Sequence, residues 1–179
     1  MVELSERSLA TMDVRALSFP DRSFDIVASM ALLEHVDGIS ECIREMARVT
    51  RWNGVVFAGF GPLWFVHGGP HYLGGYEHLW LDEVGFRRYL DSRAIPHEQS
   101  EAAHWLEHGM FSRRTYDEYL EAFRCHLELL HVMVFVSYEG LRFKESHPEE
   151  WASLRRHWTE KDLLTSGAAI WARPKRKDR

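Results

Sequence analysis

Features that mark several classes of protein are scarce in this sequence of 179 residues. Its two cysteines, Cys42 and Cys125, stand in no C-x-x-C or zinc-ribbon spacing, so a disulfide framework is not indicated. No stretch approaches the roughly 18 uninterrupted apolar residues of a membrane span. The N-terminus, with Glu3, Glu6 and Arg7, lacks the pattern of a signal peptide. We therefore expect a soluble, cytoplasmic protein that has no membrane partner.

An excess of basic residues is also absent. Lysine and arginine number 22 against 27 aspartates and glutamates, which gives a formal net charge of −5. Such a chain has no broad electrostatic attraction to phosphate backbones, so we expect no nucleic-acid partner. The basic run at 173–179 is more typical of a solvated terminus than of a binding site.

The hydrophobic content of 45% suffices for one substantial core, which favours a single domain over residues 1–179. Residues 24–33 are nearly all apolar after Asp25, and this pattern predicts a strand buried on both faces. Helical spacing of apolar residues follows from Gly38 to Arg48, and 55–58 reads as a second buried strand. Strand, helix and strand at this spacing form a βαβ unit, so the predicted class is α/β.

The segment 59–81 breaks both periodicities with six glycines and two prolines, among many aromatics and histidines. A loop of this length inside a compact domain is typical of a functional segment. Later helices are predicted from Asp82 to about Leu90, after Thr115, which forms a capping box with Glu118, and from Pro148. Strands are predicted at 127–138 and 168–172.

Several strings together resemble the class I S-adenosylmethionine-dependent methyltransferases, in the group that acts mainly on small molecules. They are Asp13 followed by ALSFPDRSFDIVASMALLEHV, then REMARVTRWNGVVFAG, and the closing SGAAIWARPKRK. The likeness is firm over 13–59 and looser at the final strand. The loop GPHYLGGYEHLW also resembles the substrate-covering insert of some members.

The resemblance implies that S-adenosylmethionine is the cofactor and lies across the carboxyl ends of the strands, as ligands generally do in open α/β sheets. Asp13 then matches the acid that accepts a hydrogen bond from the adenine amino group, with the Val14 backbone beside it. Ser29, Met30 and Ala31 match the strand end that flanks the methionine part of the cofactor. Without the surrounding strings, Asp13 reads equally well as a turn or cap residue.

His35 is the candidate catalytic residue. Methyl transfer from a sulfonium to a hydroxyl requires alignment and removal of a proton, and a histidine can be the base at neutral pH. The alternative is that His35 only bonds to the backbone where strand meets helix, with Glu34 as an orienting or solvated partner.

The family's glycine-rich cofactor loop has no counterpart here, because the twelve residues before Asp13 contain no glycine. VELSERSL at 2–9 resembles the end of the second strand, which makes Glu3 the candidate ribose acid. We expect an N-terminally truncated fold, explained by a shortened chain, by a partner that supplies the missing part, or by loss of cofactor binding. A sheet without its central strand exposes unpaired edges, so we expect a homodimer, including one with exchanged elements.

The inserted lid is expected at about 60–112, between core segments 13–59 and 127–173. His71, His78 and Trp80 are its candidate substrate-binding residues, because polar groups set into an apolar pocket fix orientation. Trp80 reads equally well as a packing residue.

The eleven histidines raise the question of a metal, since His104 with His108 and His67 with His71 each stand four apart. No third ligand can be read from the sequence, and the HExxH motif is absent, so we predict no metal site.

The predicted fold is α/β, a Rossmann-like, mostly parallel sheet with helices on both faces. The predicted function is S-adenosylmethionine-dependent methyl transfer to a small-molecule acceptor. The alternative is a noncatalytic methyltransferase-like protein that binds a ligand or serves as a partner subunit, and a metal-dependent hydrolase stands third.

Overall fold

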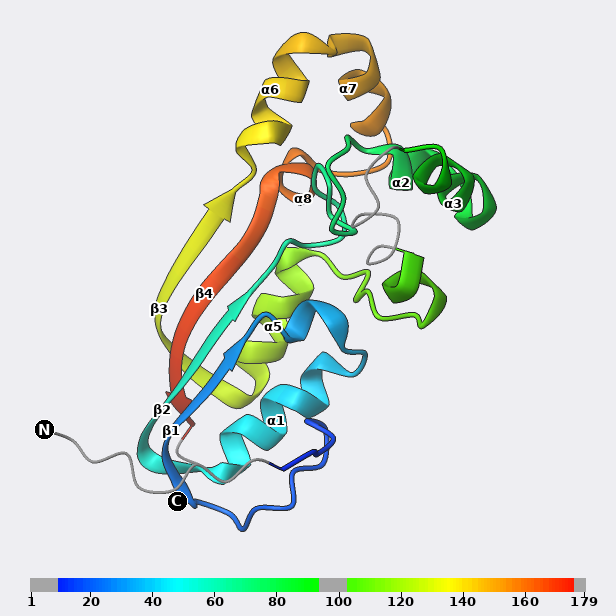
Figure 1. The fold of residues 1–179 in the computed structure, drawn as a ribbon. Helices are drawn as coiled ribbons and strands as arrows, with labels where there is room; N and C mark the ends of the chain where they lie inside the picture. Colours follow the sequence, from blue (N-terminus) through cyan, green and yellow to red (C-terminus); the bar gives the residue numbers. More distant parts are fainter. Residues whose placement is uncertain (1–9, 94–102, 176–179) are drawn as a thin grey trace, which may run out of the picture.

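A computed structural model describes residues 10–93 and 103–175 of the chain. Glu3, the predicted ribose acid, lies outside these residues. The described part contains a four-stranded sheet in the order β1-β2-β4-β3 (Figure 1). Its strands are β1 (Phe24–Met30), β2 (Thr50–Phe60), β3 (Leu127–Val136) and β4 (Thr165–Pro174).

The predicted α/β class is confirmed, but the sheet is mixed and not mostly parallel. β1 and β2 run parallel, joined through α1 (Ile39–Val49), as the βαβ pattern predicts. β4 runs antiparallel to both β2 and β3. The reason lies in the connection: the short helices between β3 and β4 cap one end of the sheet, so the chain turns back there and does not cross over.

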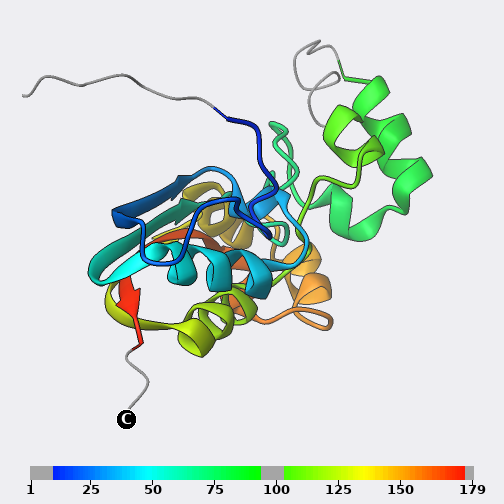
Figure 2. The same cartoon turned by 90° about the horizontal axis from the view of Figure 1, so that it is seen from below.

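One face of the sheet carries the main core. α1 and α5 (Tyr116–His126) lie side by side against this face (Figures 1 and 2). Ile43 and Met46 of α1 and Phe123 of α5 pack there with Ile170 of β4. Burying each such side chain contributes roughly 1.5–3 kcal/mol to folding.

The prediction of helices on both faces is wrong for the described residues, because none of them forms a helix over the opposite face (Figure 1). The related expectation that β1 is buried on both faces is therefore wrong as well. Val27 packs against the core, whereas Ile26 is 70% exposed and Met30 is 66% exposed. Neighbouring residues of a strand point to opposite faces, so one apolar run serves one covered and one bare face.

The remaining elements gather at the carboxyl ends of β1 and β2. They are the 3-10 helix η1 (Leu33–His35), α2 (Glu77–Trp80), α3 (Glu83–Asp91), a helical segment at 103–107, α6 (Tyr138–Ser146), α7 (Pro148–Leu154) and α8 (Glu160–Leu164). The predicted starts are confirmed: Asp82 caps α3, Thr115 and Glu118 form the capping box of α5, and Pro148 opens α7. None of the helices in the described residues is both long and apolar enough to cross a bilayer.

Candidate active site

The candidate site is built where β1 ends. Ala31 takes a positive φ of 47° and its N–H donates to the Gly59 carbonyl at 2.9 Å, which turns the chain out of the sheet. The 3-10 helix η1 follows at once and carries Glu34 and His35. A residue of α5 fixes the position of η1, because the Tyr119 hydroxyl donates to the Leu33 carbonyl at 3.1 Å.

Glu34 points into the protein. Its side chain is only 3% exposed, and Oε1 accepts a hydrogen bond from the Gly61 N–H at 3.1 Å. The Glu34 carbonyl accepts from the Ser112 N–H at 2.8 Å. Desolvation raises the pKa of this carboxyl above its usual value. Glu34 therefore joins the ends of β1 and β2 to the segment before α5, and it is not a solvated residue.

His35 has a defined tautomer. Its Nδ1 lies 2.9 Å from the Met110 carbonyl oxygen, which can only accept, so Nδ1 carries the proton and Nε2 keeps its lone pair. The ring lies against the Trp105 ring, with centroids 3.7 Å apart. Desolvation lowers the pKa of His35 to about 4, with the neighbouring His71 acting in the same direction. The imidazole is thus neutral at physiological pH and can accept a proton at Nε2.

A hollow of about 350 Å³ brings three of the predicted site residues together. Asp13, Val14 and His35 all line it, along with residues from the 108–110 segment. The stretch that carries Asp13 is fixed on α1, because the Leu17 N–H donates to Glu45 Oε2 at 3.0 Å. The separation of residues 13, 14 and 35 in the sequence does not require them to lie together. Their shared hollow therefore supports the roles that the family resemblance implies for them.

The Asp13 carboxylate is engaged by a neighbour. Arg15 donates to both of its oxygens, with N···O distances of 2.8–3.2 Å. These hydrogen bonds lower the pKa of Asp13 to about 2, so the group is an anion at neutral pH. Both side chains are about half exposed, which leaves oxygen lone pairs open to a further donor.

The strand-end residues lie elsewhere. Met30 and Ala31 line a separate hollow of about 690 Å³ on the bare face of the sheet, whereas Ser29, also in β1, is buried. The described residues thus divide the predicted cofactor contacts between two hollows and do not unite them in one.

The three candidate substrate residues have different surroundings. His71 lies beside His35, with ring centroids 5.0 Å apart, and stacks on Phe111 at 5.9 Å. His78 is 6% exposed, and its ring nitrogens lie 2.7 Å from the Trp64 carbonyl oxygen and 3.1 Å from the Tyr72 hydroxyl. Trp80 is partly exposed beside α6. Only His71 is brought next to His35.

The histidine pairs form no metal cluster. No group of three or more potential ligands that could hold a metal occurs in residues 10–93 and 103–175. The rings of His104 and His108 lie 4.2 Å apart, and His108 Nδ1 donates to the His104 carbonyl. His67 lies instead against Tyr76 and Phe143.

Sequence reasoning did not find Trp105, Met110 and Phe111, which form the wall against His35 and His71. Met110 acts through its backbone carbonyl, and it is separated from His35 by 75 residues. No side-chain pattern could have indicated such a contact.

Comparison with known proteins agrees with the sequence motifs. Residues 2–58 match the family described as a methyltransferase domain. Over 51 residues the chain is 43% identical to a malonyl-[acyl-carrier protein] O-methyltransferase of Halorhodospira halophila, and the match covers 28% of this chain and 17% of that protein.

Solved structures agree in fold. The [4+2]-cyclase SpnF is matched with a TM-score of 0.50 at 16% identity, over 94% of this chain and 56% of that one. Another match is a geranyl diphosphate C-methyltransferase from Streptomyces coelicolor A3(2), solved with Mg²⁺, geranyl diphosphate and S-adenosyl-L-homocysteine. Its TM-score is 0.49 at 12% identity, over 93% of this chain and 52% of that one. The chain spans little more than half the length of either structure. Residues 2–58 are thus similar in sequence to a methyltransferase domain, and the described residues share the α/β fold of SpnF.

Proposed function

We propose that this chain takes part in S-adenosylmethionine-dependent methyl transfer to a small-molecule acceptor. The observation that carries the proposal is the hollow in which Asp13, Val14 and His35 meet, in a chain whose residues 2–58 match a methyltransferase domain. Proton acceptance at His35 and anion character at Asp13 are the two properties that the reaction requires at these positions.

The donor set fits the adenosyl end of this cofactor. Asp13 offers carboxylate oxygens to an exocyclic amino group, and the Val14 backbone lies next to it on the same hollow. When bound, the cofactor supplies a methyl group on a positively charged sulfur. Ser29, Met30 and Ala31 at the end of β1 are the further residues that we propose to contact it.

His35 is proposed to accept the proton of the acceptor group. An oxygen or nitrogen acceptor that gains a methyl group must release one proton, and Nε2 of a neutral imidazole takes it up. The Met110 carbonyl holds the ring in the required tautomer through Nδ1–H. The Trp105 ring contacts the His35 ring edge to face, with centroids 3.7 Å apart.

Residues 60–112 are proposed to form the substrate-covering segment, within a single domain whose core is 13–59 and 127–173. His71, Trp105 and Phe111 place aromatic surface beside His35, which suits an acceptor with an apolar or aromatic body. A cytoplasmic location is proposed as well, since both cysteines are free thiols.

A second candidate is a noncatalytic, methyltransferase-like subunit. It is favoured by the Arg15 guanidinium, which already occupies the Asp13 carboxylate. Isothermal titration with S-adenosylmethionine and S-adenosylhomocysteine separates the two proposals. Saturable binding that Asp13→Asn weakens supports the enzyme, whereas absence of binding supports the noncatalytic subunit.

A further inference from the structure

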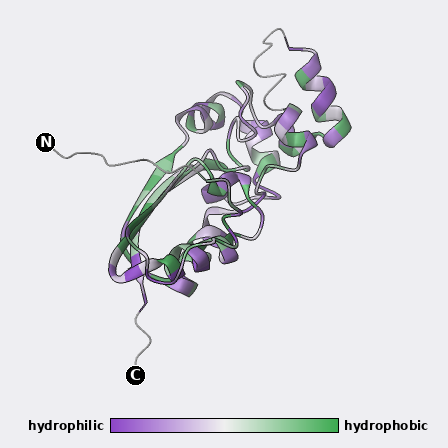
Figure 3. Ribbon diagram, turned by 60° about the horizontal axis from the view of Figure 1, so that its bottom comes forward, coloured by the Kyte–Doolittle hydropathy of each residue, from purple (hydrophilic) through white to green (hydrophobic). Residues whose placement is uncertain are grey.

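Tyr119 of α5 is a buried polar residue at the end of the sheet where the candidate site lies. Its side chain is fully buried in a core whose strands are hydrophobic along much of their length (Figure 3). Its ring stacks on Phe60 of β2, with centroids 4.7 Å apart. Desolvation raises the pKa of the hydroxyl to about 12, so the group is a neutral donor at physiological pH. A buried hydroxyl needs a hydrogen-bond partner, and here the partner is the Leu33 carbonyl of η1 at 3.1 Å.

The helix α5 gives this contact a fixed support. Its first turn is closed by the capping box of Thr115 and Glu118, and the Tyr119 N–H donates to the Thr115 carbonyl at 3.3 Å. Phe123, one turn further along, is fully buried in the same core as Tyr119. A side chain near the start of a capped and closely packed helix has little freedom to move. The Tyr119 hydroxyl therefore fixes the Leu33 carbonyl relative to the core.

The 3-10 helix η1 depends on such outside contacts. It has only three residues and no side-chain N-cap, and one backbone hydrogen bond from the His35 N–H closes it. Helices of this type have poor hydrogen-bond geometry and occur in short pieces. Groups from other elements bond to the Leu33 carbonyl and to both the carbonyl and the carboxyl of Glu34. The orientation of η1 is thus set by its neighbours, and His35 is its last residue.

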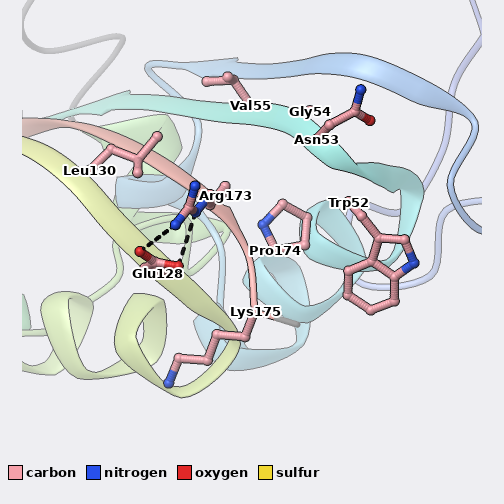
Figure 4. Close-up of a pocket in the computed structure, with 9 residues that line it drawn as sticks. All are labelled: Trp52, Asn53, Gly54, Val55, Glu128, Leu130, Arg173, Pro174 and Lys175. Atoms are coloured by element: carbon pink, nitrogen blue, oxygen red, sulfur yellow. Dashed lines mark hydrogen bonds and ion pairs between the residues drawn. The ribbon is translucent and has the colours of Figure 1, made fainter. Parts of the chain in front are cut away.

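Polar bonding at the opposite end of the sheet is of a different kind. In the hollow of about 670 Å³ there, Arg173 of β4 donates to Glu128 of β3, so the ion pair joins two neighbouring strands (Figure 4). Both side chains are about half exposed, and exposed pairs contribute little to stability. The Tyr119 hydrogen bond differs in two respects: it is buried, and it joins the core to a segment outside the sheet.

We propose that Tyr119 is a positioning residue for His35. Its hydroxyl holds η1 so that the imidazole keeps its bond to the Met110 carbonyl, with Nδ1 protonated and Nε2 as the acceptor. The inference rests on the proposed function, in which His35 takes up a proton. Loss of the hydroxyl leaves the buried Leu33 carbonyl without its donor, so η1 moves to satisfy it. Misplacement of a reacting group by about 1 Å lowers a rate on the order of 100-fold, so this support matters for the chemistry.

Tyr119→Phe in the full chain tests the proposal, because it removes one oxygen and keeps the ring that stacks on Phe60. Nitrogen-15 NMR of the histidine rings reports which nitrogen is protonated, and the spectrum of His35→Asn assigns the His35 signals. We expect the Nδ1–H form in the parent. In Tyr119→Phe the population should shift toward the Nε2–H form, and the Nδ1 proton should exchange with water at least about ten-fold faster.

Tyr116→Phe is the matched control. Tyr116 is also buried on α5, but its ring lies beside Lys161 of α8, with Nζ 5.0 Å from the ring centroid. This variant should leave the His35 tautomer and the exchange rate unchanged. Circular dichroism and urea unfolding establish that both variants are folded under the conditions of the NMR measurement.

A measurement on the parent makes the test independent of how the variants fold. The Tyr119 hydroxyl proton should be visible by NMR and should show a nuclear Overhauser contact to Leu33. A hydroxyl proton without that contact, an unchanged Nδ1–H signal in Tyr119→Phe, or the same change in Tyr116→Phe would each overturn the proposal. These readouts involve neither cofactor nor acceptor, so their failure is distinct from failure of the proposed function, which S-adenosylmethionine binding tests.

Discussion

The Nδ1 atom of His35 donates to the Met110 carbonyl oxygen over 2.9 Å, across 75 residues of sequence. This contact fixes which nitrogen of the ring holds a proton. Nε2 is thereby left as an acceptor, in a residue that lines the same hollow as Asp13. The relationship turns a histidine beside a strand end into a candidate base of defined orientation.

Replacing His35 with asparagine tests this role. The asparagine amide can still donate to the Met110 carbonyl, but no acceptor remains at the position of Nε2. We expect the methyl-transfer rate to fall by roughly 100-fold or more, the usual contribution of a general base. Binding of S-adenosylmethionine, measured by calorimetry, should stay within about two-fold, because no adenosyl contact is assigned to His35. A variant with the full rate would leave His35 only a structural role.

Asp13 and Arg15 make a second test. Asp13→Asn should weaken S-adenosylmethionine binding by about ten-fold, because a charge-assisted hydrogen bond becomes a neutral one. Arg15→Gln should bind at least as well as the parent, since it frees the carboxylate from its neighbour. Neither variant should change the unfolding midpoint appreciably, because exposed ion pairs contribute little stability. Weaker binding in Arg15→Gln would show that the arginine itself holds the ligand.

We expect two substitutions of Glu34 to change the stability of the fold in opposite directions. Glu34→Gln keeps an oxygen that accepts from the Gly61 N–H and removes a buried carboxylate whose pKa is raised by desolvation. A raised carboxyl pKa means that stability is lost as pH rises above the unfolded value, so Glu34→Gln should be more stable than the parent at neutral pH.

Glu34→Ala, in contrast, leaves the Gly61 N–H without its acceptor and should lose about 1–3 kcal/mol. Urea unfolding at neutral pH checks both variants. Equal loss of stability in the two would show that the charge of Glu34, and not its hydrogen bond, supports the fold.

Acid should destabilise the protein through His78. Burial lowers the pKa of His78 to about 3, from 6.5 in a model peptide. The unfolded chain then takes up a proton that the native state refuses, so stability is complete above the unfolded pKa and is lost as pH falls toward 3. Between about pH 7.5 and about pH 5 this one residue accounts for about 2 kcal/mol.

Urea unfolding at the two pH values measures the loss, and His78→Gln is the control that should reduce it. His35 shifts in the same direction, so part of the dependence remains in that variant. A pH dependence that His78→Gln does not alter would contradict the assignment.

Local patterns predicted most elements well. The capping residues Asp82 and Thr115 and the proline at 148 each begin a helix, because a cap depends on side chains only a few positions apart. Strand boundaries were less accurate. β2 begins at Thr50, although Trp52, Asn53 and Gly54 look like a helix stop. Thr50 pairs with Phe24 of β1, and the regular pairing with β1 resumes only at Val55.

The direction of the strands and the coverage of the sheet could not be predicted. An apolar run such as Ile26–Met30 is compatible with a strand in a parallel or a mixed sheet, with or without a helix on its second face. The two antiparallel pairings of β4 arise from the path of α6, α7 and α8, which no periodicity describes.

The sequence by itself determined the α/β class, the resemblance to methyltransferases and the choice of Asp13 and His35, because these depend on residue types at short spacings. Tertiary structure alone decided that Asp13 and His35 share one hollow and that His71 lies beside His35, whereas His78 is buried. It also decided that Met30 lies on the uncovered face of the sheet. The physical reason is distance along the chain. Contacts between residues tens of positions apart depend on how helices and strands pack, and that packing is a property of the whole fold.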